Sequence, residues 1–220
     1  MTLPTRHPAR RFRAMMTAAA LGAVLVALPG CQLAGALAVL LPAPKKTVKA
    51  EYPYMNNEKL CILVNAEMET LFDFPHVQYE LSEYISREVE KNVKGATVVS
   101  PRTIDELQRR DSRWSMRDPA RIGAQFGATK VMVIDLTQYA TREADSPHLY
   151  RGRVSANIRV YDADYFDHQP TFTASIDTVW PTDSPAGAWG IDDAEVRDAT
   201  MRQFADELVG RFYDRRVELH

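Results

Sequence analysis

Two short apolar runs constrain the fold of this chain most strongly. Residues 60–64 read LCILV, and residues 130–136 read KVMVIDL. Runs of this length are too short for a buried helix and too apolar for a strand that has one solvated face. They are typical of central strands covered on both sides, as in a sheet with helices packed against it.

A second pattern follows in the last third of the chain. In residues 151–161 (RGRVSANIRVY) apolar side chains occupy every second position, and residues 171–180 (TFTASIDTVW) repeat the alternation. Such a period of two indicates strands with one buried and one solvated face. We predict that the two segments pair as an antiparallel hairpin joined by a long loop.

Helical spacing separates these strands. Apolar residues recur at three- and four-residue intervals from Val77 to Val93, and Gly95 follows as a stop signal. Ser100-Pro101 and Asp118-Pro119 each open a shorter helix, and Asp192-Asp193 opens a long one. One face of the long helix carries the apolar positions, with one polar member: Val196, Thr200, Phe204, Leu208 and Phe212.

The predicted order of elements is therefore β-α-β-α-α-β-β-β-α, including a short strand at 96–100. This order predicts an α/β (α+β) fold, with a mixed sheet and packed helices. We expect one globular domain over residues 59–217, preceded by a tether over 31–58 and an export signal over 1–30. About 190 residues are enough for one domain of ordinary size.

The export signal is inferred from the first 31 residues. Four arginines and no acidic residue precede an apolar run of signal-peptide length, which ends in Leu28-Pro29-Gly30-Cys31. This ending resembles a lipobox, in which a cysteine thiol receives diacylglycerol and becomes residue one of the mature protein. Gly30 is the small residue that the signal peptidase requires. We therefore predict lipidation at Cys31.

Three other interpretations of this segment stay open. The apolar character continues past Cys31, so an uncleaved membrane helix over residues 14–42 is one, although Pro29-Gly30 interrupts it. Ordinary signal cleavage, with Cys31 as a spare thiol, is another. Arg10-Arg11 also suits a twin-arginine signal, which would change the export route alone.

Composition and motifs narrow the function. The formal net charge of −2 argues against nucleic acid as a partner, and the segment to be removed carries four of the arginines. The chain has no phosphate-binding glycine loop, no nucleophile elbow and no paired histidines. We accordingly expect no catalytic residues, no cofactor and no bound metal. Cys61, inside the first apolar run, is expected to be a small buried side chain.

One surface feature suggests a contact with a partner. Arg151, Arg153, Arg159 and Tyr161 occupy the positions of the 151–161 strand that face away from its apolar side. Arginine and tyrosine are favoured at protein interfaces. We therefore take these four residues as the candidate partner-binding site, while a solvated strand face with cross-strand ion pairs remains the alternative.

The order of elements resembles a known group of envelope lipoproteins. The segments that carry the resemblance are YELSEYISREVEKNV, ARIGAQFGATKVMVIDLTQY and RVSANIRVYDAD. The group includes LpoB-like activators of penicillin-binding proteins, the curli-secretion lipoprotein CsgG and the amino-terminal domain of TolB. The chain also resembles an uncharacterised family of planctomycete-type lipoproteins, through TLFDFP, SPHLYRGR and DDAE. The resemblance implies an envelope location and assigns no activity.

We therefore expect a lipid-anchored, non-enzymatic module that binds another envelope protein. Gln32 follows the lipidated cysteine where inner-membrane retention uses Asp, so the resemblance implies the outer membrane, facing the periplasm. A subunit of an envelope secretion or transport assembly, or an envelope hydrolase with an unfamiliar site, remains the alternative. The chain has no pair of long alternating segments left over for a CsgG-like pore.

Overall fold

The computed structural model describes residues 45–143, 146–164, 169–183, 190 and 192–218. The chain divides into two compact units, one of residues 1–46 with 217–220 and one of residues 47–216. Cys31 and the predicted export signal lie outside the described residues. Strands β1 (Lys45–Val48) and β7 (Arg215–Glu218) form a small sheet of their own.

The unit of residues 47–216 is built on a five-stranded sheet with the strand order β3-β2-β4-β5-β6. Its strands are β2 (Lys59–Ala66), β3 (Thr97–Val98), β4 (Lys130–Glu143), β5 (Ser146–Asp162) and β6 (Phe172–Trp180). Strand β2 runs parallel to β3 and β4, whereas β5 runs antiparallel to both of its neighbours, β4 and β6. The predicted mixed sheet and the β5–β6 hairpin are confirmed.

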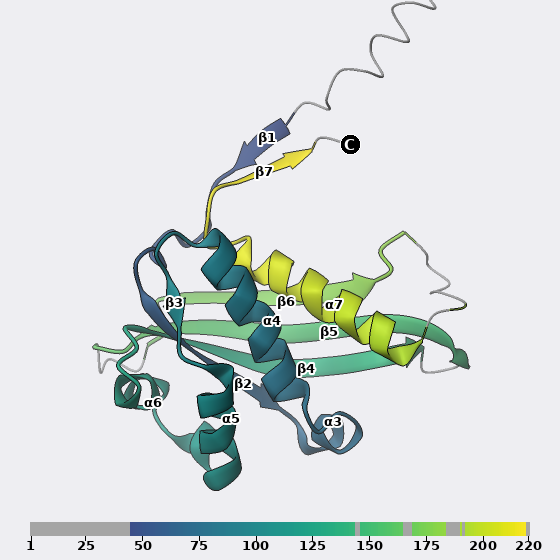
Figure 1. The fold of residues 1–220 in the computed structure, drawn as a ribbon, viewed down its shortest axis with the longest axis horizontal. Coiled ribbons are helices and arrows are strands. Elements are labelled where there is room, and N and C mark those ends of the chain that lie inside the picture. Colours follow the sequence, from purple (N-terminus) through teal and green to yellow (C-terminus); the bar gives the residue numbers. More distant parts are fainter. Residues whose placement is uncertain (1–44, 144–145, 165–168, 184–189, 191, 219–220) are drawn as a thin grey trace, which may run out of the picture. The chain divides into compact units, whose positions relative to one another are not determined.

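The longest helices, α4 (Val77–Asn92) and α7 (Asp193–Val209), lie side by side across one face of this sheet (Figure 1). They bury the even-numbered side chains of the strands, among them Ile134, Ile158 and Ile176. Phe204 of α7, together with Phe212 beyond its end, is fully enclosed in this core. The apolar face predicted for the last helix is therefore the face that packs on the sheet.

Shorter helices accompany the opposite face. They are α5 (Pro101–Arg110), the single 3₁₀ turn η1 (Trp114–Met116) and α6 (Pro119–Gln125). Together with odd-numbered strand residues such as Leu63 and Val133 they form a second, smaller apolar cluster. The two clusters explain why β2 and β4 are apolar on both faces, as the continuous runs predicted.

Capping residues fix where the helices begin. The Asp118 carboxylate accepts a hydrogen bond from the Ala120 amide at 3.0 Å, and Asp192 accepts one from the Glu195 amide at 2.8 Å. Both caps agree with the predicted helix starts. Ser100 precedes a helix that has Pro101 in its first turn, but its side chain forms no capping bond.

The segment predicted as a tether enters the fold earlier than expected. Tyr52 and Met55 are 7% and 0% exposed and belong to the main core. The prediction was wrong here because single aromatic and methionine residues in a polar stretch show no periodicity. The segment between β2 and α4, for which the sequence pattern predicts no element, also contains a short helix, α3 (Met68–Asp73), which has no buried residue.

None of the helices in the described part of the chain is both long and apolar enough to cross a bilayer.

Candidate functional site

Strand β5 carries the four candidate residues on one face, opposite to α4 and α7. The residues between them, such as Val154 and Ile158, are buried in the main core. We call this odd-numbered face of β5 the β5 stripe; its members are Arg151, Arg153, Ser155, Asn157, Arg159 and Tyr161. The predicted alternation of the strand is confirmed.

The two ends of the β5 stripe have different surroundings. Arg151 and Arg153 lie 3.9 and 2.8 Å from the Glu143 carboxylate at the end of β4. Arg159 instead lies 2.6 Å from Asp135. Because a strand rises by about 3.3 Å per residue, Arg153 and Arg159 are roughly 20 Å apart. The four candidates therefore belong to two separate places rather than to one cluster.

Tyr161 differs from the prediction of a solvated side chain. It is 7% exposed and packs in the second apolar cluster, beside Val131. Alternation along a strand tells which face a residue occupies but not what covers that face. Here the segment from α5 to α6 covers the end of β5, so the tyrosine ring is enclosed.

A pocket of about 230 Å³ opens beside Arg159. We call it the Trp114 pocket. Strands β2, β4 and β5 supply one side of it, and η1 with the start of α6 supplies the other. Its lining is Leu63, Asn65, Trp114, Ser115, Arg117, Pro119, Ile122, Val133, Asp135, Arg159 and Tyr161.

Polar side chains from three neighbouring strands meet in this pocket. Asn65 lies opposite Asp135 in the β2–β4 register and donates its amide N–H to Asp135 Oδ1 at 3.2 Å. Arg159 donates to Asp135 Oδ2 at 2.6 Å. Partial burial lowers the pKa of Arg159, but the Asp135 carboxylate outweighs that effect and holds the pKa above its ordinary value. The guanidinium therefore stays charged at the pocket.

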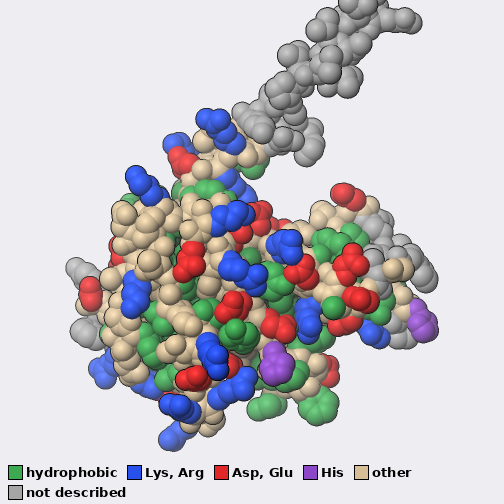
Figure 2. Space-filling model, viewed as in Figure 1, with side chains coloured by type: hydrophobic (Ala, Val, Ile, Leu, Met, Phe, Trp, Pro, Cys, Tyr) green, Lys and Arg blue, Asp and Glu red, His purple; other side chains and the backbone are tan. Residues whose placement is uncertain are grey.

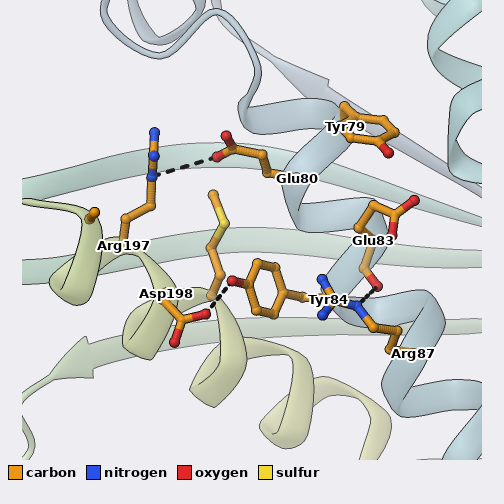
Figure 3. Close-up of a pocket in the computed structure, with 9 residues that line it drawn as sticks. Tyr79, Glu80, Glu83, Tyr84, Arg87, Arg197 and Asp198 are labelled. Atoms are coloured by element: carbon orange, nitrogen blue, oxygen red, sulfur yellow. Dashed lines mark hydrogen bonds and ion pairs between the residues drawn. The ribbon is translucent and has the colours of Figure 1, made fainter.

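A second hollow lies between α4 and α7, and its polar groups are matched across the two helices (Figure 3). Tyr84 donates its hydroxyl to Asp198, and Arg197 lies 3.7 Å from Glu80. The hydrogen bond from Tyr84 lowers the pKa of Asp198. Figure 2 shows acidic and basic side chains interspersed over these helices. These polar groups thus pair with one another across the two helices.

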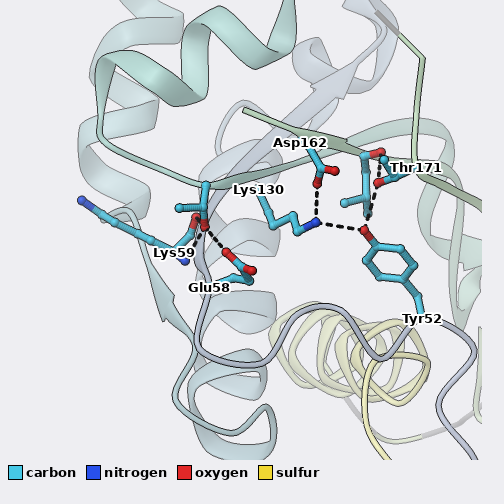
Figure 4. A network of polar contacts seen from close by, with 8 residues as sticks. Tyr52, Glu58, Lys59, Lys130, Asp162 and Thr171 are labelled. Atoms are coloured by element: carbon cyan, nitrogen blue, oxygen red, sulfur yellow. Dashed lines mark hydrogen bonds and ion pairs between the residues drawn. The ribbon is translucent and has the colours of Figure 1, made fainter. Parts of the chain in front are cut away.

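A third polar group surrounds Lys130, which is 9% exposed (Figure 4). Its ammonium group contacts Asp162 and, at 3.2 Å, the hydroxyl of Tyr52, which lies 2.9 Å from Thr171 Oγ1. Burial lowers the pKa of Lys130. The hydrogen bonds to Asp162 and Tyr52 raise it by more than burial lowers it, so the pKa lies above its ordinary value. This network attaches the incoming chain at Tyr52 to β4 and β5.

The remaining candidates for chemistry are few. Across the described ranges, no three His, Cys, Asp or Glu side chains are grouped in a way that would hold a metal ion. Cys61 is fully buried, as predicted, and burial raises the pKa of its thiol to about 12. A thiol with so little thiolate is a poor nucleophile and a poor metal ligand.

Sequence reasoning missed most of the Trp114 pocket. Asn65 and Asp135 carried a usable signal, because each is the polar residue that interrupts a continuous apolar run in neighbouring strands. Trp114 and Arg117 carried none, since they lie in a connection between two short helices. A side chain in such a connection reaches a strand face only through the tertiary fold.

No family model matches the sequence, and no curated protein matches it. Among solved structures, the chain is similar to the PelC dodecamer from Paraburkholderia phytofirmans in two crystal forms. Both are 7% identical, with TM-scores of 0.48 and 0.44, and the matches cover 79% of this chain and 100% of that one.

Two further solved structures are lipoprotein GNA1162 from Neisseria meningitidis and TolB from Acinetobacter baumannii. GNA1162 is 15% identical with a TM-score of 0.37, and the match covers 68% of this chain and 99% of that one. TolB is 12% identical with a TM-score of 0.34, and the match covers 76% of this chain but 29% of TolB. The solved structures similar to this chain thus include bacterial lipoproteins.

Proposed function

We propose that this protein is a lipid-anchored envelope lipoprotein that binds another envelope protein and catalyses no reaction itself. The anchor is Cys31, at the end of a basic and then apolar leader. Gln32 after the cysteine favours the outer membrane, with the folded unit facing the periplasm. The partner-binding site lies at the Arg159 end of the β5 stripe.

One observation carries the choice of that end. Arg159 lies where the Trp114 pocket meets the exposed polar part of the sheet, which includes Asn157 and Ser175. Arginine, tryptophan and tyrosine are the residue types that contribute most to protein interfaces, and here Arg159, Trp114 and Tyr161 line one pocket. At the other end of the stripe, Arg151 and Arg153 both contact the Glu143 carboxylate.

The electrostatic state of Arg159 supports the same choice. Its side chain is 44% exposed although it pairs with Asp135. Asp135 holds the guanidinium in place and leaves it in reach of a partner. A prepositioned arginine loses less side-chain entropy on binding than a mobile one, which favours affinity.

The test is crosslinking and affinity capture from membranes that contain the wild type or the Arg159→Glu variant. The matched control is Arg202→Glu, because Arg202 is also an exposed arginine paired with a carboxylate, on helix α7. We expect Arg159→Glu to lose the captured envelope protein and Arg202→Glu to retain it. Equal capture by all three proteins would contradict the proposed contact.

A further inference from the structure

We propose that the Trp114 pocket binds the C-terminal carboxylate of a peptide chain whose last side chain is apolar. This proposal rests on the proposed function, because the peptide terminus would belong to the bound envelope protein. It names the chemistry that the pocket would recognise in that protein. The size of the pocket, its apolar floor and the arginines at its rim support this proposal.

The floor of the pocket is apolar and deeply enclosed. Leu63 and Ile122 are each 1% exposed, Val133 is 5% exposed, and Trp114 is 7% exposed. These side chains belong to one apolar cluster that joins the strands to η1 and α6. A hollow with this floor stabilises an apolar group that leaves water.

The volume of the pocket limits what enters it. At about 230 Å³ it lies below the range of roughly 300–1,000 Å³ that is usual for sites of drug-sized ligands and cofactors. One amino-acid residue is therefore a better occupant than a nucleotide or a sugar chain. A single residue with an apolar side chain would cover the floor and leave its own polar end at the rim.

The rim carries two arginines, each of which is paired with one carboxylate, Arg117 with Asp111 and Arg159 with Asp135. Its charged side chains are Arg117, Arg159 and Asp135. Both Asp135 oxygens accept hydrogen bonds within the pocket, from Asn65 and from Arg159. Their engagement weakens Asp135 as an acceptor for a bound amine and favours a ligand that itself accepts hydrogen bonds.

The two guanidinium groups match a carboxylate. Each guanidinium has five N–H donors in a planar fork. Arg159 contacts Asp135 through Nη2, and Arg117 contacts Asp111 through Nη1 at 3.2 Å. Carboxylates, like phosphates, accept from such forks in bidentate geometry. A carboxylate joined to an apolar side chain is what the end of a peptide offers.

The probe for a direct test is N-acetyl-L-leucine, which has both the apolar side chain and the terminal carboxylate. Its binding to the purified, processed protein is measured by calorimetry, with fluorescence of Trp114 as a second readout and Trp114→Phe to assign that signal. Three compounds serve for comparison. N-acetyl-L-leucinamide lacks the carboxylate, and acetate lacks the side chain. Octanoate represents a lipid chain.

We expect N-acetyl-L-leucine to bind at least about tenfold more tightly than the amide or acetate. The amide loses the hydrogen-bonded charge, and acetate lacks the apolar contact. Arg159→Gln should weaken its binding by about tenfold or more, whereas Arg202→Gln should leave it unchanged. Circular dichroism and thermal unfolding of each variant show whether it is folded.

Three results would overturn the proposal: no binding of N-acetyl-L-leucine at 10 mM (roughly the weakest useful affinity of a single residue), equal binding of the amide, or tighter binding of octanoate.

The proposed function can fail independently of this ligand site. If Arg159→Glu loses the envelope protein while the probe does not bind, the contact at Arg159 stands and the carboxylate site is wrong. If the probe binds while capture is unaffected, the partner contact is wrong and the ligand site stands.

Discussion

Arg159 of β5 and Asp135 of β4 form a diagonal cross-strand ion pair, with Nη2 and Oδ2 separated by 2.6 Å. In the register of the two strands Asp135 lies opposite Asn157, and Arg159 lies opposite Val133. The pair thus spans one step of the ladder and holds the guanidinium beside the Trp114 pocket. A diagonal neighbour is within reach only of a long side chain such as arginine.

This geometry predicts a small effect of Arg159 on folding. The Arg159 and Asp135 side chains are 44% and 28% exposed, and ion pairs so open to solvent contribute about 0–1 kcal/mol. We expect Arg159→Gln to change the free energy of unfolding, measured in urea, by less than about 1 kcal/mol. A loss of several kcal/mol would assign Arg159 a structural role, and capture experiments with its variants would then report folding.

Gly152 is the position on β5 where helix α7 approaches most closely. A Cβ atom at residue 152 would lie 1.7 Å from Thr200 Oγ1 and 2.7 Å from Thr200 Cβ. We expect Gly152→Ala to destabilise the protein by about 1–3 kcal/mol, as overpacked cores do. Adding Thr200→Ala removes the shorter contact and should restore part of the loss. An unchanged free energy of unfolding for Gly152→Ala would show that α7 does not pack against β5 as described.

Cys61 should be almost inert in the folded protein. The sequence holds two cysteines, so Cys61 is the only thiol in a Cys31→Ser chain. Because burial raises its pKa from 9.0 to about 12, we expect labelling by an aromatic disulfide at pH 8 to be about 100-fold slower or more than in urea. Equal labelling rates in the two states would contradict the buried position.

The same pKa shift predicts how the free energy of unfolding changes with pH. Between pH 9.0 and about 12 the unfolded chain releases the Cys61 proton while the folded chain retains it. The thiol therefore lowers stability as pH rises through this window, by up to about 1.4 kcal/mol per pH unit. We expect Cys61→Ala to remove that contribution, which is seen as a shallower alkaline slope in urea unfolding.

The sheet and its main helices could be predicted because their signals are local. LCILV and the alternation from Val154 to Val160 mark their own strands, and the caps at Asp118 and Asp192 mark helix starts. The end of β4 could not be predicted. The register shifts between Leu136 and Gln138, so the strand exchanges its faces there and Tyr139 turns inward. A bulge of this kind destroys the periodicity that would have extended the strand.

The candidate site was predictable in part. Strand alternation placed Arg159 and Tyr161 on one face, and the structure brings both to the Trp114 pocket. Alternation contains no information on the distant segment that covers a strand end, so the burial of Tyr161 was missed. The contacts of Arg151 and Arg153 with Glu143 depend on where β4 ends, which is the boundary that the bulge concealed.

Lipidation of Cys31 is the most direct test of the proposed membrane anchor. Cells that express the wild type or Cys31→Ser are fed labelled palmitate, and their membrane fractions are examined by mass spectrometry. We predict that the wild type carries the label, begins at Cys31 and stays with the membranes, because two or three acyl chains suffice for stable anchoring. Cys31→Ser should carry no label. The lipid anchor would be contradicted by a Cys31→Ser protein that keeps the label. It would also be contradicted by a wild type that carries no label and retains residues 1–30, and that result would favour a membrane helix over residues 14–42.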